Sequence, residues 1–392
     1  MNKLPLEGIR VIDFSWIIAG PTCTRMLGMM GAEIIKIESH RRPDPTRVGG
    51  GGNFHFLNQS KTSLSLNLRT EEGVDIAKRL ISISDVLVEN YASGVIERIG
   101  LGYEDIKGNN PNLIMVSSSG LGHSGPDKDY VAYGSLLQHY TGWNSISGYP
   151  DNEPIKGGLW ADPWVGLEIA MLSCAALTNR LTTGLGQYID FSMSEALTST
   201  LPEAILDYQM NKRVVTPQGN KDRNYVPHGV YKCKGKDRWI AIAVTEDNQW
   251  QNLCKIINRE DLITNDRFSS KESRLFIEDE VNSIISQWTK DLEDEEAMKI
   301  LQSIGIAAGP SLDIGRVYEN KQLKDSGYFA PFINTDGETR ELPLLPWHFE
   351  DGLELNMTPV PSLGEGNEYV FRDLLGLSEK EIVDFKNEQI IY

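Results

Sequence analysis

The sequence predicts an α/β fold, with a largely parallel sheet in a large domain and an α+β arrangement in a smaller domain. In the first 120 residues, short apolar runs alternate with helical patterns. Strands separated by helices of this length form parallel sheets through βαβ crossovers. After residue 215 the pattern breaks, and a new series of strands and helices starts. The 392 residues, 40% of them hydrophobic and 24% charged, are sufficient for two globular domains.

The expected elements of the parallel sheet follow one another closely. Apolar runs predict the strands, and apolar residues that recur with a helical period predict the helices. Ligands of such sheets usually bind at the carboxyl ends of the strands. The predicted strands are Ile9–Phe14, Glu33–Glu38, Ser63–Leu68, Val86–Glu89 and Leu113–Ser117, and the helices between them are Thr22–Met30 and Glu71–Ile83.

A long helix is expected from Asp162 to Leu181. The regular pattern then breaks from Pro217 to Gly235. A second unit begins at Tyr231, with a strand at Arg238–Val244 and helices after it, and a helical tail is expected from Ser378. The long helix carries a face of small residues suited to close packing, which consists of Gly166, Ala170, Ser173 and Ala176.

The charge and the cysteines restrict the partners and the compartment. A formal net charge of −17 repels nucleic-acid phosphates and anionic membrane surfaces, so neither is an expected partner. No window approaches the roughly 20 apolar residues of a membrane-spanning helix, and the N-terminus lacks a signal-peptide pattern. The four cysteines are widely separated, without C-x-x-C pairs. We therefore expect a cytoplasmic protein with reduced thiols.

One segment has the opposite charge. Between Lys36 and Arg69 the net charge is +4. This segment suits an anionic small molecule, although solvated surface charges explain each residue equally well. Its basic residues are Lys36, Arg41, Arg42, Arg47, Lys61 and Arg69.

The segment Gly120–Gly125 matches the G-x-G-x-x-G pattern of dinucleotide-binding proteins. Such a site needs a helix that starts at the last glycine and an acid about 20 residues later. Here Pro126–Asp129 has the composition of a turn, and no Asp or Glu occurs from Tyr130 to Pro150. We therefore expect no NAD or FAD. The six histidines show no metal-ligand spacing, so no metal is expected either.

Asp162 precedes Pro163 at the start of the predicted long helix. Asp followed by Pro is typical of a helix N-cap and the first helical position after it. A carboxylate at that position is kept ionised by amide donors and by the helix dipole, and it can also attack an activated acyl group. The residues alone leave both interpretations open, a structural cap and a catalytic nucleophile.

Short motifs run in a fixed order along nearly the whole chain. The motifs are Leu6–Asp13, Ala19–Pro21, Gly31–Glu38, Pro43–Arg47, Asn58 with Lys61, Ser63–Leu68, Asp85–Tyr91, Arg98–Tyr103, Ser119–Pro126, Thr183–Asp190 and Pro361–Glu365. Each motif is weak alone, but the ordered set is specific. By this set the chain resembles the class III CoA-transferases, which include formyl-CoA transferase, carnitine CoA-transferase and the α-methylacyl-CoA racemases.

The resemblance implies a Rossmann-like large domain of residues 1–215 and 316–392, a small domain of residues 225–315, and two interlocked subunits. It also implies that Asp162 is the nucleophile, which forms first an acyl-aspartyl anhydride and then an aspartyl-CoA thioester. We further expect the backbone amides of Gly157 and Gly158 to stabilise oxyanions at the aspartyl carbonyl. The residues carried over as contacts of coenzyme A are Trp16, Ile17, Arg47, Lys61, Asn90, Tyr91 and Arg98.

Three positions depart from the family pattern. Tyr133 occupies the position of the catalytic histidine of the racemases, which disfavours a racemase. Ser39 occupies the position of a basic CoA ligand, so Arg41 or Arg42 is expected to replace that ligand. Gly366 replaces a family histidine, and the sequence offers no reason for it.

We therefore expect a CoA-transferase that moves CoA from an acyl-CoA donor, such as succinyl-CoA, to an organic acid. Its partners are these two substrates and a second subunit, either identical or related. Two alternatives stay open: an acyl-CoA racemase or isomerase of the same family, and a non-catalytic subunit of a heteromeric transferase. An aromatic or dicarboxylic acceptor such as benzylsuccinate would suit the tryptophans near the motifs, which are Trp16, Trp143, Trp160 and Trp164.

Overall fold

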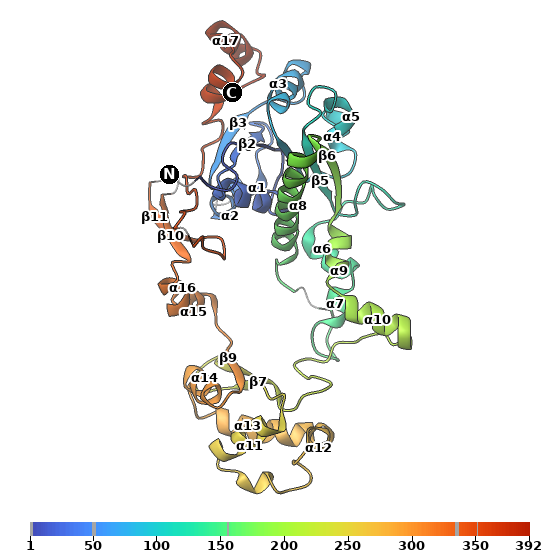
Figure 1. Cartoon of the computed structure of the whole chain (residues 1–392), viewed down its shortest axis with the longest axis vertical. Helices are drawn as coiled ribbons and strands as arrows, with labels where there is room; N and C mark the ends of the chain where they lie inside the picture. Colours follow the sequence, from blue (N-terminus) through green and yellow to red (C-terminus); the bar gives the residue numbers. More distant parts are fainter. Residues whose placement is uncertain (1–2, 49–51, 155–156, 334–336, 351) are drawn as a thin grey trace. The chain divides into compact units, whose positions relative to one another are not determined.

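The computed structural model describes residues 3–48, 52–154, 157–333, 337–350 and 352–392. The chain divides into two compact units, whose elements are labelled in Figure 1. Unit 1 consists of Met1–Asn144, Lys156–Val214 and Gly327–Tyr392, and unit 2 consists of Ser145–Ile155 and Val215–Ser326. In sequence, most of unit 2 is therefore inserted between the two ends of unit 1.

A six-stranded sheet forms the centre of unit 1, with the order β3-β2-β1-β4-β5-β6. Every neighbouring pair is parallel, which confirms the predicted α/β class and parallel sheet. The strand order reverses beside β1, as in doubly wound nucleotide-binding folds. The strands are β1 (Arg10–Asp13), β2 (Glu33–Glu38), β3 (Lys61–Ser65), β4 (Val86–Glu89), β5 (Ile114–Ser119) and β6 (Gln187–Ser192).

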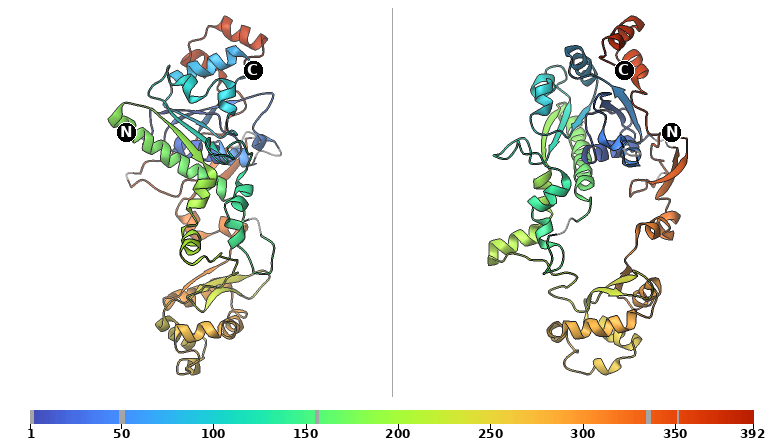
Figure 2. Two further views of the ribbon diagram at one scale, coloured as in Figure 1. Left: turned by 90° about the vertical axis from the view of Figure 1, so that its right-hand side faces the viewer. Right: turned by 180° about the vertical axis from the view of Figure 1, so that it is seen from behind.

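Helices cover both faces of this sheet, because successive strand residues point to opposite sides. Val11 of β1 belongs to a core cluster shared with α1 and α8, whereas Ile12 belongs to the cluster shared with α3 and α17. The two helical layers can be followed in Figure 2. These helices are α1 (Ala19–Met29), α3 (Glu71–Ser82), α8 (Ala161–Thr183) and α17 (Glu379–Asn387).

The small-residue face predicted on the long helix is confirmed by its packing against α1. A Cβ on Gly166 would lie 2.6 Å from both the Ala19 carbonyl oxygen and the Thr22 Cβ. Real Cβ contacts are not this short, so glycine permits the close approach of the two helices. This packing fixes the start of α8 beside the sheet.

The last part of the chain packs beside the edge strand β3 and explains one departure from the family pattern. The Gly366 amide donates a hydrogen bond to the Ser63 carbonyl oxygen at 2.9 Å. A Cβ on Gly366 would lie 2.1 Å from Thr62 Cγ2. A larger side chain at this position would require the Thr62 side chain to move, so the glycine has a packing role.

Unit 2 has a core of its own, formed by a three-stranded antiparallel sheet and four helices. The fully buried Trp250 stacks on Phe268 within this core. The strands, in the order β7-β8-β9, are β7 (His228–Lys232), β8 (Trp239–Ala243) and β9 (Ala307–Pro310), and the helices are α11 (Asp247–Ile256), α12 (Lys271–Phe276), α13 (Glu278–Thr289) and α14 (Asp294–Ser303).

The remaining elements are short helices and one hairpin. Within the described ranges, no helix is long and apolar enough to cross a membrane. These remaining short elements are η1 (Pro45–Arg47), α2 (Gly52–Leu57), α4 (Val95–Ile99), α5 (Tyr103–Ile106), α6 (Gly134–Tyr140), α7 (Trp143–Ile146), α9 (Met193–Ser199), α10 (Pro202–Asn211), η2 (Glu260–Leu262), α15 (Ile314–Tyr318), α16 (Lys321–Asp325), the hairpin β10 (Phe329–Ile333) and β11 (Thr339–Pro343), and η3 (Tyr369–Leu374).

Candidate active site

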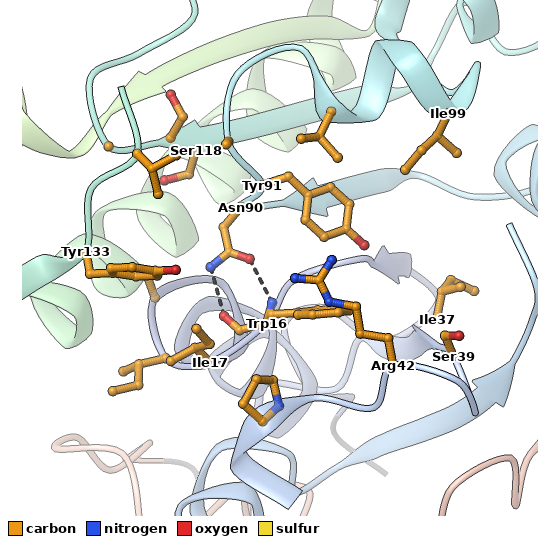
Figure 3. A pocket seen from close by; sticks show the side chains of 18 of the residues that line it. Trp16, Ile17, Ile37, Ser39, Arg42, Asn90, Tyr91, Ile99, Ser118 and Tyr133 are labelled. Atoms are coloured by element: carbon orange, nitrogen blue, oxygen red, sulfur yellow. Dashed lines mark hydrogen bonds between the residues drawn. The ribbon is translucent and has the colours of Figure 1, made fainter. Parts of the chain in front are cut away.

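A cavity of about 590 Å³ lies at the carboxyl ends of the parallel strands (Figure 3). This is where open α/β sheets bind their ligands. Asp162, at the start of α8, lines the same cavity. The strand ends and loops that contribute to it are Trp16–Ala19, Ile37–Ser39, Leu66–Arg69, Asn90–Ala92 and Ser118–Gly120.

Asp162 lies within the first turn of α8 and is not its N-cap, so that prediction is wrong. The N-cap is Trp160, whose backbone is already helical (φ −89°, ψ −26°), and the helix starts at Ala161. Pro163 loses no intrahelical bond in this first turn, where N–H groups have no helical acceptor. The half-buried Asp162 carboxylate accepts a hydrogen bond from the Gly134 backbone amide. Burial raises the pKa of Asp162, and this hydrogen bond partly offsets the rise.

The loop before Asp162 is held by a side chain of α6. Gln138 is fully buried, and its Nε2 donates a hydrogen bond to the Gly158 carbonyl oxygen at 3.0 Å. The amide that contacts Asp162 belongs to Gly134, which the sequence analysis did not single out. No local signal could have revealed this residue, because the contact joins two separate helices. The oxyanion role of Gly157 and Gly158 stays a prediction.

The turn after β1 carries Trp16 and Ile17 into the cavity in a strained conformation. Ile17 has φ 67°, which a β-branched residue rarely adopts. Asn90 holds the turn with two hydrogen bonds (Figure 3): the Trp16 amide donates to Oδ1 at 2.7 Å, and Nδ2 donates to the Trp16 carbonyl oxygen at 2.9 Å. Tyr91 packs edge-on against the Trp16 ring, with 6.1 Å between centroids. The structure therefore brings four predicted site residues together.

Buried charges beneath this turn support it. The Ser15 amide donates to Asp13 Oδ1 at 2.8 Å, and Lys36 Nζ donates to the Ser15 carbonyl oxygen at 2.6 Å. Lys61 Nζ lies 3.0 Å from Asp13 Oδ2, and both side chains are fully buried. Against the effect of burial, the Lys61 and Lys36 cations lower the pKa of Asp13 to about 2. Lys61 thus contacts the network under the turn and does not line the cavity.

The basic segment contributes cations directly to the cavity. The Arg42 guanidinium lies 4.9 Å from the centre of the Trp16 ring (Figure 3). Among the described residues, no carboxylate lies within ion-pair distance of Arg42. Ser39 lines the cavity beside it. The arginines of the segment that line the cavity are Arg41, Arg42 and Arg69.

The other two predicted cationic contacts lie elsewhere. Arg47 Nη2 lies 2.6 Å from Glu38 Oε2, and its guanidinium lies 3.7 Å from the centre of the Phe54 ring. Arg98 is exposed on α4, a helix whose Val95 lines the cavity. The structure therefore does not place Arg47 or Arg98 in the cavity wall.

A buried carboxylate that the sequence analysis missed ends strand β4. Glu89 is fully buried, and its Oε2 accepts a hydrogen bond from the Tyr91 amide at 2.7 Å. His123 Nε2 lies 3.8 Å from Glu89 Oε1. Burial raises the pKa of Glu89 to about 8, so this group is largely protonated at neutral pH. The sequence signal for this residue was an acid at the end of the strand Val86–Glu89, whose other residues are all apolar.

The comparison with known families agrees with this geometry. A protein-family model described as CoA-transferase family III matches residues 6–367 of the sequence. The chain belongs to CoA-transferase family III. The resemblance expected from the sequence motifs is thereby confirmed, and the protein is an enzyme of the CoA-transferase type.

Curated relatives and a solved structure match over nearly the full length. The chain is 28% identical to succinyl-CoA–D-citramalate CoA-transferase of Chloroflexus aurantiacus, over 99% of this chain and 98% of the relative. It is 30% identical to the succinyl-CoA–L-malate CoA-transferase beta subunit of the same organism, over 100% and 99%. A CAIB/BAIF family protein from Brucella suis has a TM-score of 0.86 at 29% identity, over 95% of this chain and 100% of that one.

Other features of this family III chain concern the racemase histidine, the dinucleotide site and the metal site that were considered from the sequence. Tyr133 lines the cavity, whereas His139 is exposed on α6 and is not among the lining residues. After β5 the chain forms turns and bends, and the next helix begins only at Gly134. Within the part of the chain that the structure describes, no group of three His, Cys, Asp or Glu residues is arranged to hold a metal ion.

Proposed function

We propose that this family III enzyme transfers CoA from succinyl-CoA to a carboxylic acid, with Asp162 as the nucleophile. The observation that carries the proposal is that Asp162 lines the same cavity as Arg42 and Arg69. A carboxylate that attacks a thioester and cations that bind CoA phosphates are thus available to a single ligand. Burial raises the pKa of Asp162, and a more basic carboxylate is a better nucleophile once ionised.

The proposed reaction has two halves. An Asp162 carboxylate oxygen attacks the donor thioester carbonyl, the C–S bond breaks, and CoA leaves as a thiolate with the bonding electron pair. The thiolate then attacks Asp162 Cγ of the mixed anhydride, and the donor acid leaves as a carboxylate. The acceptor carboxylate reverses both steps. Splitting one difficult exchange into easier steps is the general advantage of covalent catalysis.

Coenzyme A is proposed to bind with its phosphates near Arg41, Arg42 and Arg69. Arg42 takes the part of the basic ligand that Ser39 replaces, because it faces the cavity without a carboxylate partner among the described residues. Residues of the cavity wall contact CoA directly, whereas Arg47 and Lys61 affect CoA binding only through their ion-pair partners, Glu38 and Asp13. Arg98 is exposed and does not line the cavity, so its proposed contact is with a part of the cofactor that extends beyond the cavity. The proposed wall residues are Trp16, Ile17, Asn90 and Tyr91.

A dicarboxylic acid is the proposed acceptor. The two curated relatives described above are named for citramalate and malate, which are both dicarboxylates. The support for an aromatic acceptor is weaker, because Trp143 and Trp160 pack on each other at 5.0 Å and on the core. Benzylsuccinate combines both features and belongs in the test panel. A related second subunit is also proposed, since one relative is named a beta subunit.

Trapping of the aspartyl-CoA thioester tests this function. The enzyme is incubated with succinyl-CoA and then with hydroxylamine, which converts an activated aspartyl group to a hydroxamate. Trypsin should release the peptide of residues 157–180, because Lys156 and Arg180 flank it. Mass spectrometry should find the hydroxamate on Asp162, and Asp162→Asn should show neither the hydroxamate nor CoA exchange. An unmodified Asp162 in an active enzyme contradicts the proposal, and an inactive wild-type chain supports the non-catalytic subunit.

A further inference from the structure

Gly134 and Asp162 approach each other more closely than any other residue type at position 134 would allow. Gly134 is the first residue of α6 and is buried. A Cβ built on it would lie 2.4 Å from Asp162 Oδ1, 2.7 Å from Cγ and 2.9 Å from Oδ2. These are the three nearest heavy atoms, and all belong to the carboxyl group. The carboxylate therefore occupies the space that any side chain at position 134 would need.

Other common reasons for a glycine do not apply at this position. Gly134 does not have a positive φ, so backbone freedom does not explain it. Helix propensity favours alanine over glycine by about 1 kcal/mol. The close approach to Asp162 is therefore the observation that accounts for glycine.

We infer that Gly134 is a positioning residue that holds the Asp162 carboxylate against its backbone amide in the reactive geometry. This inference rests on the proposed role of Asp162 as the nucleophile. It adds a second residue to the machinery, one whose contribution comes from a missing side chain and a backbone N–H.

The same amide has a function in each addition step at Asp162 Cγ. When the CoA thiolate attacks the anhydride, a C–S bond forms and the π electron pair of the carbonyl moves onto an Asp162 oxygen. The Gly134 N–H donates to the carboxyl group that carries this charge. The intermediate then re-forms the carbonyl and expels the donor carboxylate with the C–O bonding pair. Removal of one such donor typically lowers kcat by about 10²–10³-fold.

Gly134→Ala tests the inference, with Ser135→Ala as the control on the same helix. In Gly134→Ala the new methyl displaces the carboxylate, so we expect kcat to fall about 10²–10³-fold. CoA affinity and the far-UV circular dichroism spectrum should stay as in the wild type. Ser135→Ala should keep wild-type kcat, because Ser135 neither lines the cavity nor contributes to the pKa of Asp162, as Gly134 does.

The pH dependence separates positioning from general damage. The Gly134 hydrogen bond lowers the pKa of Asp162, so its loss should raise that pKa. The acidic limb of kcat/KM, which reports the free enzyme, should then move to higher pH in Gly134→Ala. A variant that is merely less stable would retain the wild-type limb.

A double-mutant comparison tests the steric contact itself. Gly134→Ala should lower Tm in the wild-type background but not in Asp162→Ala, where the carboxylate that meets the new methyl is absent. Equal destabilisation in both backgrounds overturns the inference, and so does a Gly134→Ala protein that fails to fold or keeps wild-type kcat. The proposed function fails separately, if wild-type Asp162 is never modified in the trapping experiment.

Discussion

Asn90→Ala should weaken CoA binding by releasing the strained turn that carries Trp16 and Ile17. The Asn90 side chain makes both hydrogen bonds of the Trp16 backbone described above, at 2.7 and 2.9 Å. No other residue offers an equivalent amide at this point of the described cavity wall. Without these bonds, the strained left-handed backbone conformation of Ile17 is less stable.

The size of the effect follows from these two contacts. Each hydrogen bond contributes about 1 kcal/mol, so the free energy of unfolding should fall by about 2 kcal/mol. Left-handed strain at a non-glycine residue is of the order of 1–3 kcal/mol. If CoA binding must restore a turn that has relaxed by about 2 kcal/mol, the Kd should rise about 30-fold.

Asn110→Ala is the matched control. Its side chain also bonds backbone groups, with Nδ2 donating to the Ile81 and Ser84 carbonyl oxygens at 3.0 and 2.7 Å and Oδ1 accepting from the Asn112 amide at 3.2 Å, but it does not line the cavity. Urea unfolding should show similar losses of stability for both variants, while calorimetry with CoA should show weaker binding only for Asn90→Ala. Unchanged CoA affinity in Asn90→Ala, or equal weakening in Asn110→Ala, refutes the reasoning.

Two further predictions concern charge. Arg42→Ala should weaken CoA binding about 10- to 100-fold at low salt and less at high salt. Arg47→Ala should mainly lower the free energy of unfolding, by about 3–5 kcal/mol, because it leaves the buried Glu38 carboxylate without its cation. Equal effects of the two variants on the CoA affinity measured by calorimetry would contradict this division. Because burial raises the pKa of Glu89 to about 8, the folded state binds the proton more tightly than the unfolded state. The wild type should therefore lose stability as the pH rises from about 5 to 8, by up to about 1.4 kcal/mol per pH unit, and Glu89→Gln should not; parallel urea-unfolding curves across this range would contradict the prediction.

The parallel sheet could be predicted from the sequence because each of its inner strands contains a short apolar run, and helices or turns separate these runs. The predicted strand Glu33–Glu38 coincides with β2, and Val86–Glu89 coincides with β4. Strand β6 was missed, since Gln187 and Tyr188 at its start are exposed and polar or aromatic. The hairpin β10–β11 was missed because proline occurs in both of its strands.

The candidate site could be predicted only where its chemistry depends on residue type. Asp162 stood out through its motif, but its place within the helix depended on the backbone of Trp160. The local excess of basic residues gave no means to distinguish Arg42 from Arg47, because Glu38 becomes a partner only when β2 folds beside the loop. Gly134 could not be found either, since its importance arises from a contact between two helices.

Transfer of an oxygen isotope tests the central claim, covalent catalysis by Asp162, most directly. In the proposed sequence the bridging oxygen of the second anhydride comes from the acceptor and stays on Asp162 when the thiolate takes the acyl group. A single turnover with succinyl-CoA and an ¹⁸O-labelled acceptor acid should therefore place one ¹⁸O atom in the peptide of residues 157–180, at Asp162, and repeated turnover should label both carboxylate oxygens. An enzyme that exchanges CoA fully while Asp162 stays unlabelled would contradict the account.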